Sequence, residues 1–449
     1  MHPLGLALVH PLHHWLCRFA VSLNVFEPCF AVTLISAVAG AVAVANLFGC
    51  VATLTRCRAA ALLACGSLGL AHTFWQMATS AETYTLVAAL LSAECWCLAL
   101  FASTRRRGWL YAMLLLNGLG VANHMLASLT TPVLGAVLLF AVRRKDIRPL
   151  DAAAALGFWI VGSLPYTLLV ATEFFRTGEV SATLGSALFG QSFADDVLNV
   201  SLRPRMLLIS AGFVVLSLPL LLPAAVYGVS RVGRRTLSVP VRRALLAGLV
   251  IHACFAARYD IVDQHTFFLP NYVYLSIFGG VGLAAVLRLV ERKTRRTLLI
   301  LWALVLALTP VAYALVPGVA RRFDVLRSVL RDKPYRDDYV NVFTPWSVAE
   351  RSAERMSHQA VQLAGEHGLI VVEDSMAEFA IRYKAIRGGH DGLQIMRGPA
   401  AQAISAAFGL GRAVVLVPAR VRAPRTEAPV GFWKRIGDLY VLTSTSADP

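Results

Sequence analysis

The feature that most constrains this chain is a series of about ten apolar stretches separated by short polar loops. The first stretch carries no charge and is long enough to cross a bilayer, which takes about 20 helical residues. Lipid offers backbone groups no hydrogen-bonding partner, so closed helices are the expected form. The stretches are 30–55, 59–79, 84–103, 109–123, 128–142, 152–172, 206–230, 244–257, 266–287 and 297–316.

Composition supports the same class. Of 449 residues, 57% are hydrophobic and only 15% are charged, which excludes a single soluble domain and indicates a polytopic membrane protein. A net charge of +16 would suggest nucleic acid as the partner of a soluble protein, but here the arginines lie in short loops where they set orientation. We therefore expect no nucleic-acid partner. The eight cysteines show no zinc-finger spacing and are expected to pack as small hydrophobes.

Positive charge alternates between successive loops. One set of loops, around 56–58, 105–107, 143–148, 231–243 and 288–296, holds about 19 lysines and arginines, whereas the opposite set holds about 4. Positively charged loops stay in the cytoplasm, so the other loops are predicted to lie outside it. This orientation brings three polar clusters, 80–84, 123–124 and 257–265, to the outer side, and it places the C-terminal tail there too.

The tail differs from the rest of the chain in composition. Predicted strands at 368–373, 393–396, 413–418 and 437–443 alternate with predicted helices at 376–387 and 400–408, which indicates a small α/β layer. The predicted fold is an all-α polytopic membrane bundle of about ten transmembrane helices with a small C-terminal α/β extracytoplasmic domain. Its parts are an extracytoplasmic or interfacial segment 1–28, a transmembrane helical domain 29–316 and a soluble extracytoplasmic domain 317–449.

The outer loops hold the residues with the most chemistry. A carboxylate near an apolar wall can have a raised pKa and act as a base, and an arginine can bind phosphate through paired hydrogen bonds. A solvated loop remains the alternative for each residue taken singly. The candidates are Glu82, Tyr84, His124, Arg258, Tyr259, Asp260, Asp263 and His265.

Other polar residues invite two interpretations each. Glu94, Asn117 and His252 fall within spans, where such groups usually pair inside the bundle but can also serve substrate or proton passage. The N-terminal histidines 2, 10, 13 and 14 can mark a metal site or an interfacial segment; two prolines and the lack of a nearby carboxylate favour the segment. The large outer loop 173–205 is partly amphipathic and can cover a site.

Several motifs taken in order resemble a known family. They are His2–Gly5 (HPLG), Ser80–Tyr84 (SAETY), Gly118–His124 (GLGVANH), Tyr259–Pro270 (YDIVDQHTFFLP) and, more weakly, Val372–Ser375 (VEDS). In this order they resemble the bacterial relatives of the transmembrane-260 type protein O-mannosyltransferases, within the GT-C class of polytopic, lipid-sugar-dependent glycosyltransferases. The resemblance covers most of the chain.

The resemblance implies a function. It implies transfer of a sugar from a polyprenyl-phosphate donor to a protein or glycan hydroxyl, on the outer face of a bacterial inner membrane. It also implies a first helix and an acidic catalytic base before the His2–Pro3 motif, where this chain begins. We therefore expect that the start lies further upstream or that the chain is an inactive relative.

Roles for the remaining candidates follow from this expectation. Glu82 is the best remaining base and Arg258 the best phosphate contact. Asp260 and Asp263 are candidates to hold the loop or a divalent cation, although no metal site is predicted from ligand spacing. His124 and His265 are candidates to position the donor, with Tyr84 and Tyr259 beside them. The alternatives are a transporter or flippase of a lipid-linked glycan, and a degenerate relative that scaffolds envelope assembly.

Overall fold

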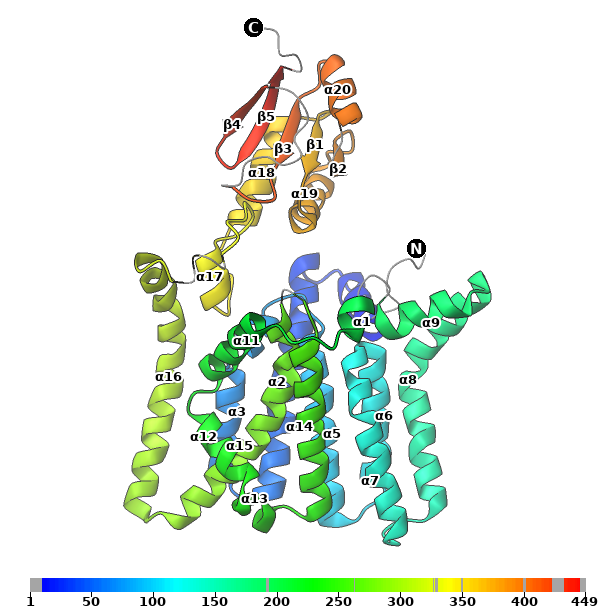
Figure 1. Cartoon of the computed structure of the whole chain (residues 1–449), viewed down its shortest axis with the longest axis vertical. Helices are drawn as coiled ribbons and strands as arrows, with labels where there is room; N and C mark the ends of the chain where they lie inside the picture. The colour runs from blue at the N-terminus through cyan, green and yellow to red at the C-terminus, as the bar shows by residue number, and fades with distance from the viewer. Residues whose placement is uncertain are drawn as a thin grey trace. The chain divides into compact units, whose positions relative to one another are not determined.

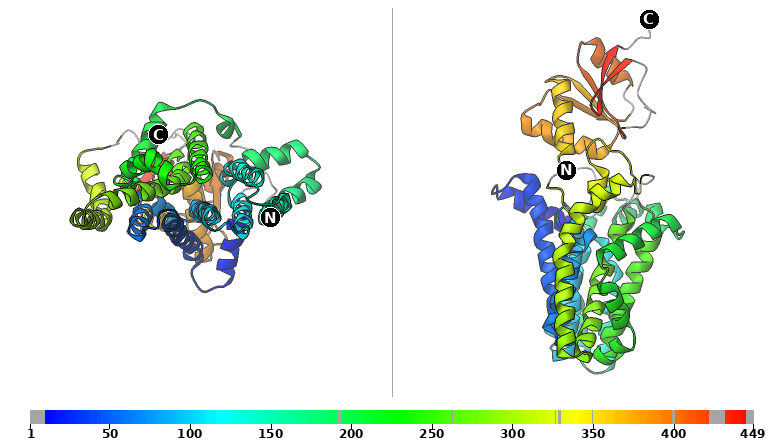
Figure 2. Two further views of the ribbon diagram at one scale, coloured as in Figure 1. Left: turned by 90° about the horizontal axis from the view of Figure 1, so that it is seen from below. Right: turned by 90° about the vertical axis from the view of Figure 1, so that its left-hand side faces the viewer.

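The computed structural model describes residues 10–190, 194–261, 263–325, 327, 330–348, 350–398, 401–421 and 432–444. The predicted motif His2–Gly5 lies outside these residues. The chain divides into two compact units, Met1–Val311 and Ala312–Pro449. The first unit is a bundle of helices, and the second combines helices with a sheet (Figures 1 and 2).

Helices of the first unit follow the predicted apolar stretches closely. Those in its first half are α1 (Pro11–Ser22), α2 (Pro28–Thr55), α3 (Arg58–Gly69), α4 (His72–Ala78), α5 (Tyr84–Thr104), α6 (Gly108–Asn123), the 3-10 helix η1 (Met125–Leu129), α7 (Thr131–Arg143) and α8 (Pro149–Thr177). The second half contains α9 (Val180–Phe189), α10 (Ala194–Leu198), α11 (Pro204–Ser217), α12 (Leu221–Val229), α13 (Arg231–Thr236), α14 (Val239–Arg258), η3 (Gln264–Phe268), α15 (Leu269–Leu289) and α16 (Arg292–Arg322).

Not every predicted stretch is one long helix. In the described part of the chain, seven helical segments are long and apolar enough to span a bilayer, and α11 with α12 forms an eighth candidate bent by 101°. The bend falls at Leu218–Leu220, where Pro219 has no amide hydrogen to continue the helix. The stretch 59–79 is interrupted between α3 and α4, and α6 has only 16 residues. These findings describe a multi-pass membrane protein.

Close helix crossings in the bundle depend on glycine. Gly118 of α6 faces Gly162 of α8, and a Cβ atom on either one would overlap a backbone carbonyl of the other helix. Gly228 of α12 and Gly282 of α15 form a second crossing of this kind. Small residues are the usual means of close packing between membrane helices, because lipid tails supply no hydrophobic drive for association.

Polar loops separate to the two ends of the bundle. At the arginine-rich end, Arg105 pairs with Asp146 at 2.8 Å, and Arg107 pairs with Asp151 at 2.8 Å. The helices α1, α9 and α11 lie at the other end, and α13 lies at the arginine-rich end (Figure 1). The grouping predicted from charge alternation is therefore present in the fold, while the compartment that each end faces stays a prediction.

The second unit contains a five-stranded sheet of order β2-β1-β3-β5-β4. Strands β1 (Leu369–Val372), β2 (Gln394–Arg397) and β3 (Val414–Val417) are parallel, whereas β4 (Phe432–Ile436) and β5 (Leu439–Ser444) pair antiparallel. The helices of this unit are α17 (Asp338–Phe343), α18 (Ser352–Ala364), α19 (Ser375–Gly388) and α20 (Ala401–Gly409).

Side chains of β1 alternate between the two faces of this sheet. Ile370 packs with residues of α18 and α19, and Val371 packs with residues of α20. A strand covered on both faces is apolar throughout, which explains why 368–373 was recognisable as a buried strand. The predicted strands and helices of the tail are confirmed, while α17, α18 and β4 were not predicted.

Candidate functional site

The loop before α5 carries Glu82 and is clamped to α2. The Ser36 hydroxyl donates to the Glu82 carbonyl oxygen at 2.8 Å, and the Glu82 amide donates back to Ser36 Oγ at 3.1 Å. Thr85 Oγ1 also donates to the Ser36 carbonyl, at 2.9 Å. These bonds hold the backbone of the loop in place, so the Glu82 side chain extends from a fixed backbone position. Nothing in the sequence pointed to Ser36, because its partners lie some 46 residues away.

An aromatic wall stands beside this loop. The Tyr84 ring lies 5.6 Å from the His124 ring and 5.4 Å from the Phe267 ring, measured between centroids. Tyr259 packs edge-on against Phe267 at 4.5 Å. Tyr84, His124 and Tyr259 were predicted to line the site from three distant loops, and the structure brings them together. Phe267, within the quoted 259–270 motif, is the ring that joins them.

Two carboxylates lie at the edge of this wall. Burial raises the pKa of Glu82 above its ordinary value of 4.5, and the nearby negative charge of Asp263 raises it further. Both side chains still reach solvent. A carboxylate with a raised pKa takes up a proton more readily than an ordinary one, which suits a general base. Burial, with the charges of Asp196 and Asp263, also raises the pKa of Tyr259 to about 12, so this phenol stays protonated.

Two histidines meet at the same place. His10 adopts a left-handed backbone conformation at φ 64°, and its ring lies 4.6 Å from the His124 ring. Burial lowers the pKa of both imidazoles, so both are neutral at pH 7. His10 Nδ1 lies 2.8 Å from the carbonyl oxygen of Asn123, which can only accept, so His10 Nδ1 carries the proton and Nε2 is an acceptor. His124 Nδ1 accepts from the Leu126 amide at 3.1 Å, which leaves His124 Nε2–H as a donor.

Two of the predicted residues, Arg258 and Asp260, bind partners away from the aromatic wall. Arg258 donates through one nitrogen to the Val197 and Asn199 carbonyl oxygens, at 2.5 and 2.8 Å. Asp260 pairs with Arg203 at 2.6 Å. These contacts connect the segment after α14 to the large loop before α11. They give both residues a structural role in joining the two loops, in addition to any role in substrate binding.

His265 points toward α11 rather than the aromatic wall. Its ring stacks on Phe213 at 4.3 Å, with the ring planes 19° apart. The preceding residue, Gln264, is buried and donates to the Ala257 and Tyr259 carbonyl oxygens at 3.1 and 2.9 Å. Gln264 thus closes the polar turn that carries Asp263. It was part of a quoted motif but was not predicted as a functional residue.

Below the site, a buried polar network is centred on Asn117. Its amide nitrogen donates to Thr130 Oγ1 at 2.8 Å and lies 3.3 Å from both carboxyl oxygens of Glu94. Its oxygen accepts from Thr131 Oγ1 at 2.8 Å and Trp159 Nε1 at 2.9 Å. Glu94 therefore pairs within the bundle, which is the first of the two interpretations that its sequence position allowed. The network holds η1, the segment that follows His124.

The side chains that could ligate a metal ion are distributed as follows. Among the residues that the structure describes, no group of three or more His, Cys, Asp or Glu side chains is arranged to hold a metal ion. Asp260, proposed to hold either the loop or a cation, is paired with Arg203. His10, one of the N-terminal histidines considered for a metal site, packs against the His124 ring.

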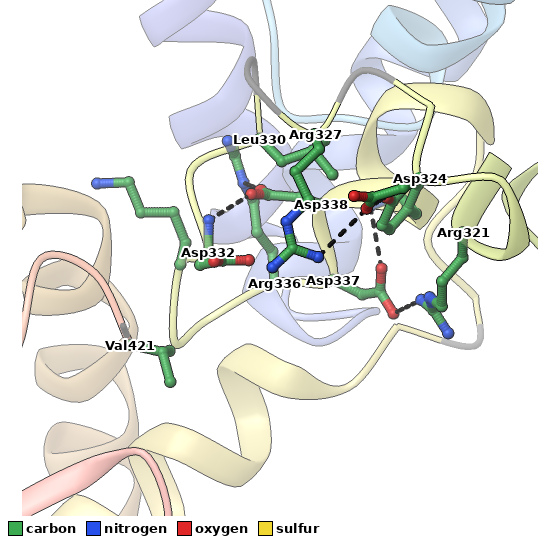
Figure 3. A pocket seen from close by; sticks show the side chains of 11 residues that line it. Arg321, Asp324, Arg327, Leu330, Asp332, Arg336, Asp337, Asp338 and Val421 are labelled. Carbon is green, nitrogen blue, oxygen red and sulfur yellow. Dashed lines mark hydrogen bonds and ion pairs between the residues drawn. The ribbon is translucent and has the colours of Figure 1, made fainter. Parts of the chain in front are cut away.

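A charged cavity of about 310 Å³ lies in the second unit (Figure 3). Its cations are paired one by one with carboxylates: Arg321 with Asp337, Arg327 with Asp324, Lys333 with Asp374 and Arg336 with Asp338. This pairing leaves the cavity without the excess positive charge that a phosphate site requires. None of the residues predicted to be functional lines it.

Comparisons with known proteins bear on the class of fold. A family model described as dolichyl-phosphate-mannose-protein mannosyltransferase matches residues 2–190, which include Glu82, Tyr84 and His124 but less than half of the chain. No curated protein sequence matches the chain. Together with the helical bundle, this match supports the GT-C glycosyltransferases as the class to which the fold corresponds.

Solved structures show the fold over nearly the whole chain. The structure of ArnT from Cupriavidus metallidurans bound to undecaprenyl phosphate matches with a TM-score of 0.55 and 14% identity, covering 98% of this chain and 88% of that one. ArnT in the apo state matches with a TM-score of 0.51 and 15% identity, covering 91% of this chain and 82% of that one. The GT-C fold predicted from the motifs is therefore confirmed.

Proposed function

We propose that this protein is a membrane glycosyltransferase that moves a sugar from a polyprenyl-phosphate donor to a hydroxyl of a protein or glycan. The observation that carries the proposal is the pair Glu82 and Asp263 beside the Tyr84–His124–Phe267 wall, at one end of a GT-C bundle. The fold likeness to a protein crystallised with undecaprenyl phosphate supports the donor class. We also propose that, within the GT-C class, this protein is a relative of the transmembrane-260 type protein O-mannosyltransferases.

The reaction is an inverting displacement. The Glu82 carboxylate takes the proton of the acceptor hydroxyl as that oxygen attacks the anomeric carbon, and the lipid phosphate leaves with the bonding electrons. His124 Nε2–H donates to a donor oxygen, and the aromatic wall excludes water from the sugar. Arg258 still has guanidinium nitrogens beyond the one that binds Val197 and Asn199, and these are available to meet phosphate charge.

The placement belongs to the proposal as well. We place the catalytic end outside the cytoplasm of a bacterial inner membrane, because the opposite end holds the arginine-rich loops. We also place the C-terminal unit in the extracytoplasmic compartment. Single-cysteine variants at Ser80 and Arg106, reacted with a membrane-impermeant maleimide on intact cells, test this: Ser80→Cys should react and Arg106→Cys should not.

The activity test offers membranes that contain the full chain a radiolabelled polyprenyl-phosphate hexose, and measures label transferred to protein or glycan. Glu82→Gln keeps the shape of the side chain but removes the base, and should lower transfer about 10²–10⁴-fold. Glu179→Gln is the matched control, since Glu179 is an exposed carboxylate before α9 with no role in the proposal. Unchanged transfer by Glu82→Gln would falsify the role of Glu82 as base.

A flippase gives a different result. Purified protein in liposomes would then move the labelled donor between leaflets without consuming it. The bond between sugar and phosphate would stay intact with the wild type and with Glu82→Gln alike. The transferase is favoured if the wild type consumes the donor and no donor moves between leaflets where none is consumed.

A further inference from the structure

A second cavity lies between α7 and α14 and shares no lining residue with the aromatic wall. It has a volume of about 410 Å³, and its lining is apolar except for one residue, Arg243. The lining extends along α14 from Val239 to Ile251, which corresponds to about 18 Å at 1.5 Å per residue. One leaflet contributes about half of the ~30 Å hydrocarbon thickness, so the groove is about one leaflet deep.

Positive charge gathers at one mouth of this groove. Arg243 lines it from the first turns of α14, and the guanidinium of Arg144 lies 5.5 Å above the ring of Phe140, another lining residue on α7. The mouth is at the arginine-rich end, because α7 ends and α14 begins there. The nearest carboxylate, Asp146, is 4.0 Å from Arg144 but pairs more closely with Arg105, at 2.8 Å.

We propose that this groove binds one anionic phospholipid from the leaflet at the arginine-rich end, with its acyl chain between α7 and α14 and its phosphate at Arg144 and Arg243. Charge complementarity argues for an anionic head group, since Arg143 and Lys145, on either side of Arg144, add positive charge to the same corner, whereas Arg148 is paired with Asp151. Basic pockets between membrane helices bind anionic head groups in this way. The depth of one leaflet argues for an ordinary acyl chain rather than a longer polyprenyl chain.

The head-group part of the proposal is tested with arginine variants. The purified full chain is incubated with equal amounts of phosphatidylglycerol and phosphatidylethanolamine of the same chain length, and bound lipid is counted by native mass spectrometry. Phosphatidylglycerol has a net negative charge, whereas the ammonium group of phosphatidylethanolamine cancels its phosphate charge, so two arginines at the head group should favour phosphatidylglycerol about ten- to thirtyfold in the wild type. The double variant Arg144→Ala/Arg243→Ala should bind both lipids nearly equally. Arg106→Ala, an exposed arginine in another loop at the same end, should keep the preference.

The acyl-chain part is tested by filling the groove. Ala136→Trp places an indole in the lining, whereas Leu139→Trp, one turn away on α7 and exposed, does not. Ala136→Trp should lose both lipids, and Leu139→Trp should behave as the wild type; size-exclusion profiles show whether each variant is folded. A wild type without preference, a folded Ala136→Trp that retains lipid, or preferential binding of added undecaprenyl phosphate that is unaffected by the arginine variants would each overturn the proposal.

Discussion

Replacing Asn117 by Leu should destabilise the helical unit more than any other single polar change near the site. Leucine has nearly the same size, so the packing volume is kept and the lost hydrogen bonds dominate the effect. The substitution leaves three groups inside the bundle short of a partner: the indole N–H of Trp159, the hydroxyl of Thr131 and the Oε1 atom of Glu94.

The expected cost follows from these three groups. Hydrogen bonds between membrane helices contribute about 0.6 kcal/mol on average and up to about 1.7 kcal/mol each, which gives roughly 2–5 kcal/mol for Asn117→Leu. Glu94→Gln should cost less, because the glutamine keeps the shape and one oxygen that accepts from Asn117. Thr297→Val is the control, since Thr297 is exposed and bonds only to the carbonyl of its own helix.

The assay is thermal unfolding in detergent, followed by the loss of the monodisperse size-exclusion peak. Asn117→Leu should lower the midpoint by about 4 °C or more, while Thr297→Val should leave it within experimental error. If Asn117→Leu melts with the wild type, the hydrogen bonds around Asn117 are not the ones that hold η1. A Glu94→Gln loss as large as that of Asn117→Leu would also refute the reasoning, because it would assign the stability to a carboxylate charge.

Three further outcomes follow from the structure. Gly118→Leu should cost about 1–3 kcal/mol or more in the same unfolding assay because its side chain would overlap α8, whereas Gly157→Leu meets only open space and should be nearly neutral. The acidic limb of the pH profile of kcat/KM should lie above pH 4.5, because Glu82 must be ionised to act as base and its pKa is raised; Asp263→Asn should move that limb to lower pH, and a shift the other way would exclude the two carboxylates as neighbours. Lys333→Met leaves a mostly buried carboxylate unpaired and should destabilise the second unit by about 2–4 kcal/mol, detected as faster proteolysis of that unit.

Much of the fold was predictable because it depends on local properties. Hydropathy marks the apolar stretches, and all of them are mainly helical, two with a break, because the backbone must satisfy its own hydrogen bonds in lipid. Charge alternation grouped the loops into two ends without any knowledge of contacts. The tail was predictable for the same reason, since a strand covered on both faces is continuously apolar, as Leu369–Val372 is. The exposed strand β4 lacks that signal, and it was missed.

The site was only partly predictable. The motifs predicted that Glu82, Tyr84, His124, Tyr259 and Asp263 cluster, and they do so because all five lie at or next to helix ends on one side of the bundle. The motifs do not determine which neighbours each side chain contacts within that cluster.

What the sequence determined by itself is thus which segments are apolar and helical and which loops share an end of the bundle. Only the tertiary structure decided that Arg258 binds the carbonyl oxygens of Val197 and Asn199, that His265 stacks on Phe213 and that His10 packs on His124. Such contacts depend on the rotation and tilt of each helix. Those are set by close crossings between distant glycines, and a change of tens of degrees moves a side chain from one neighbour to another.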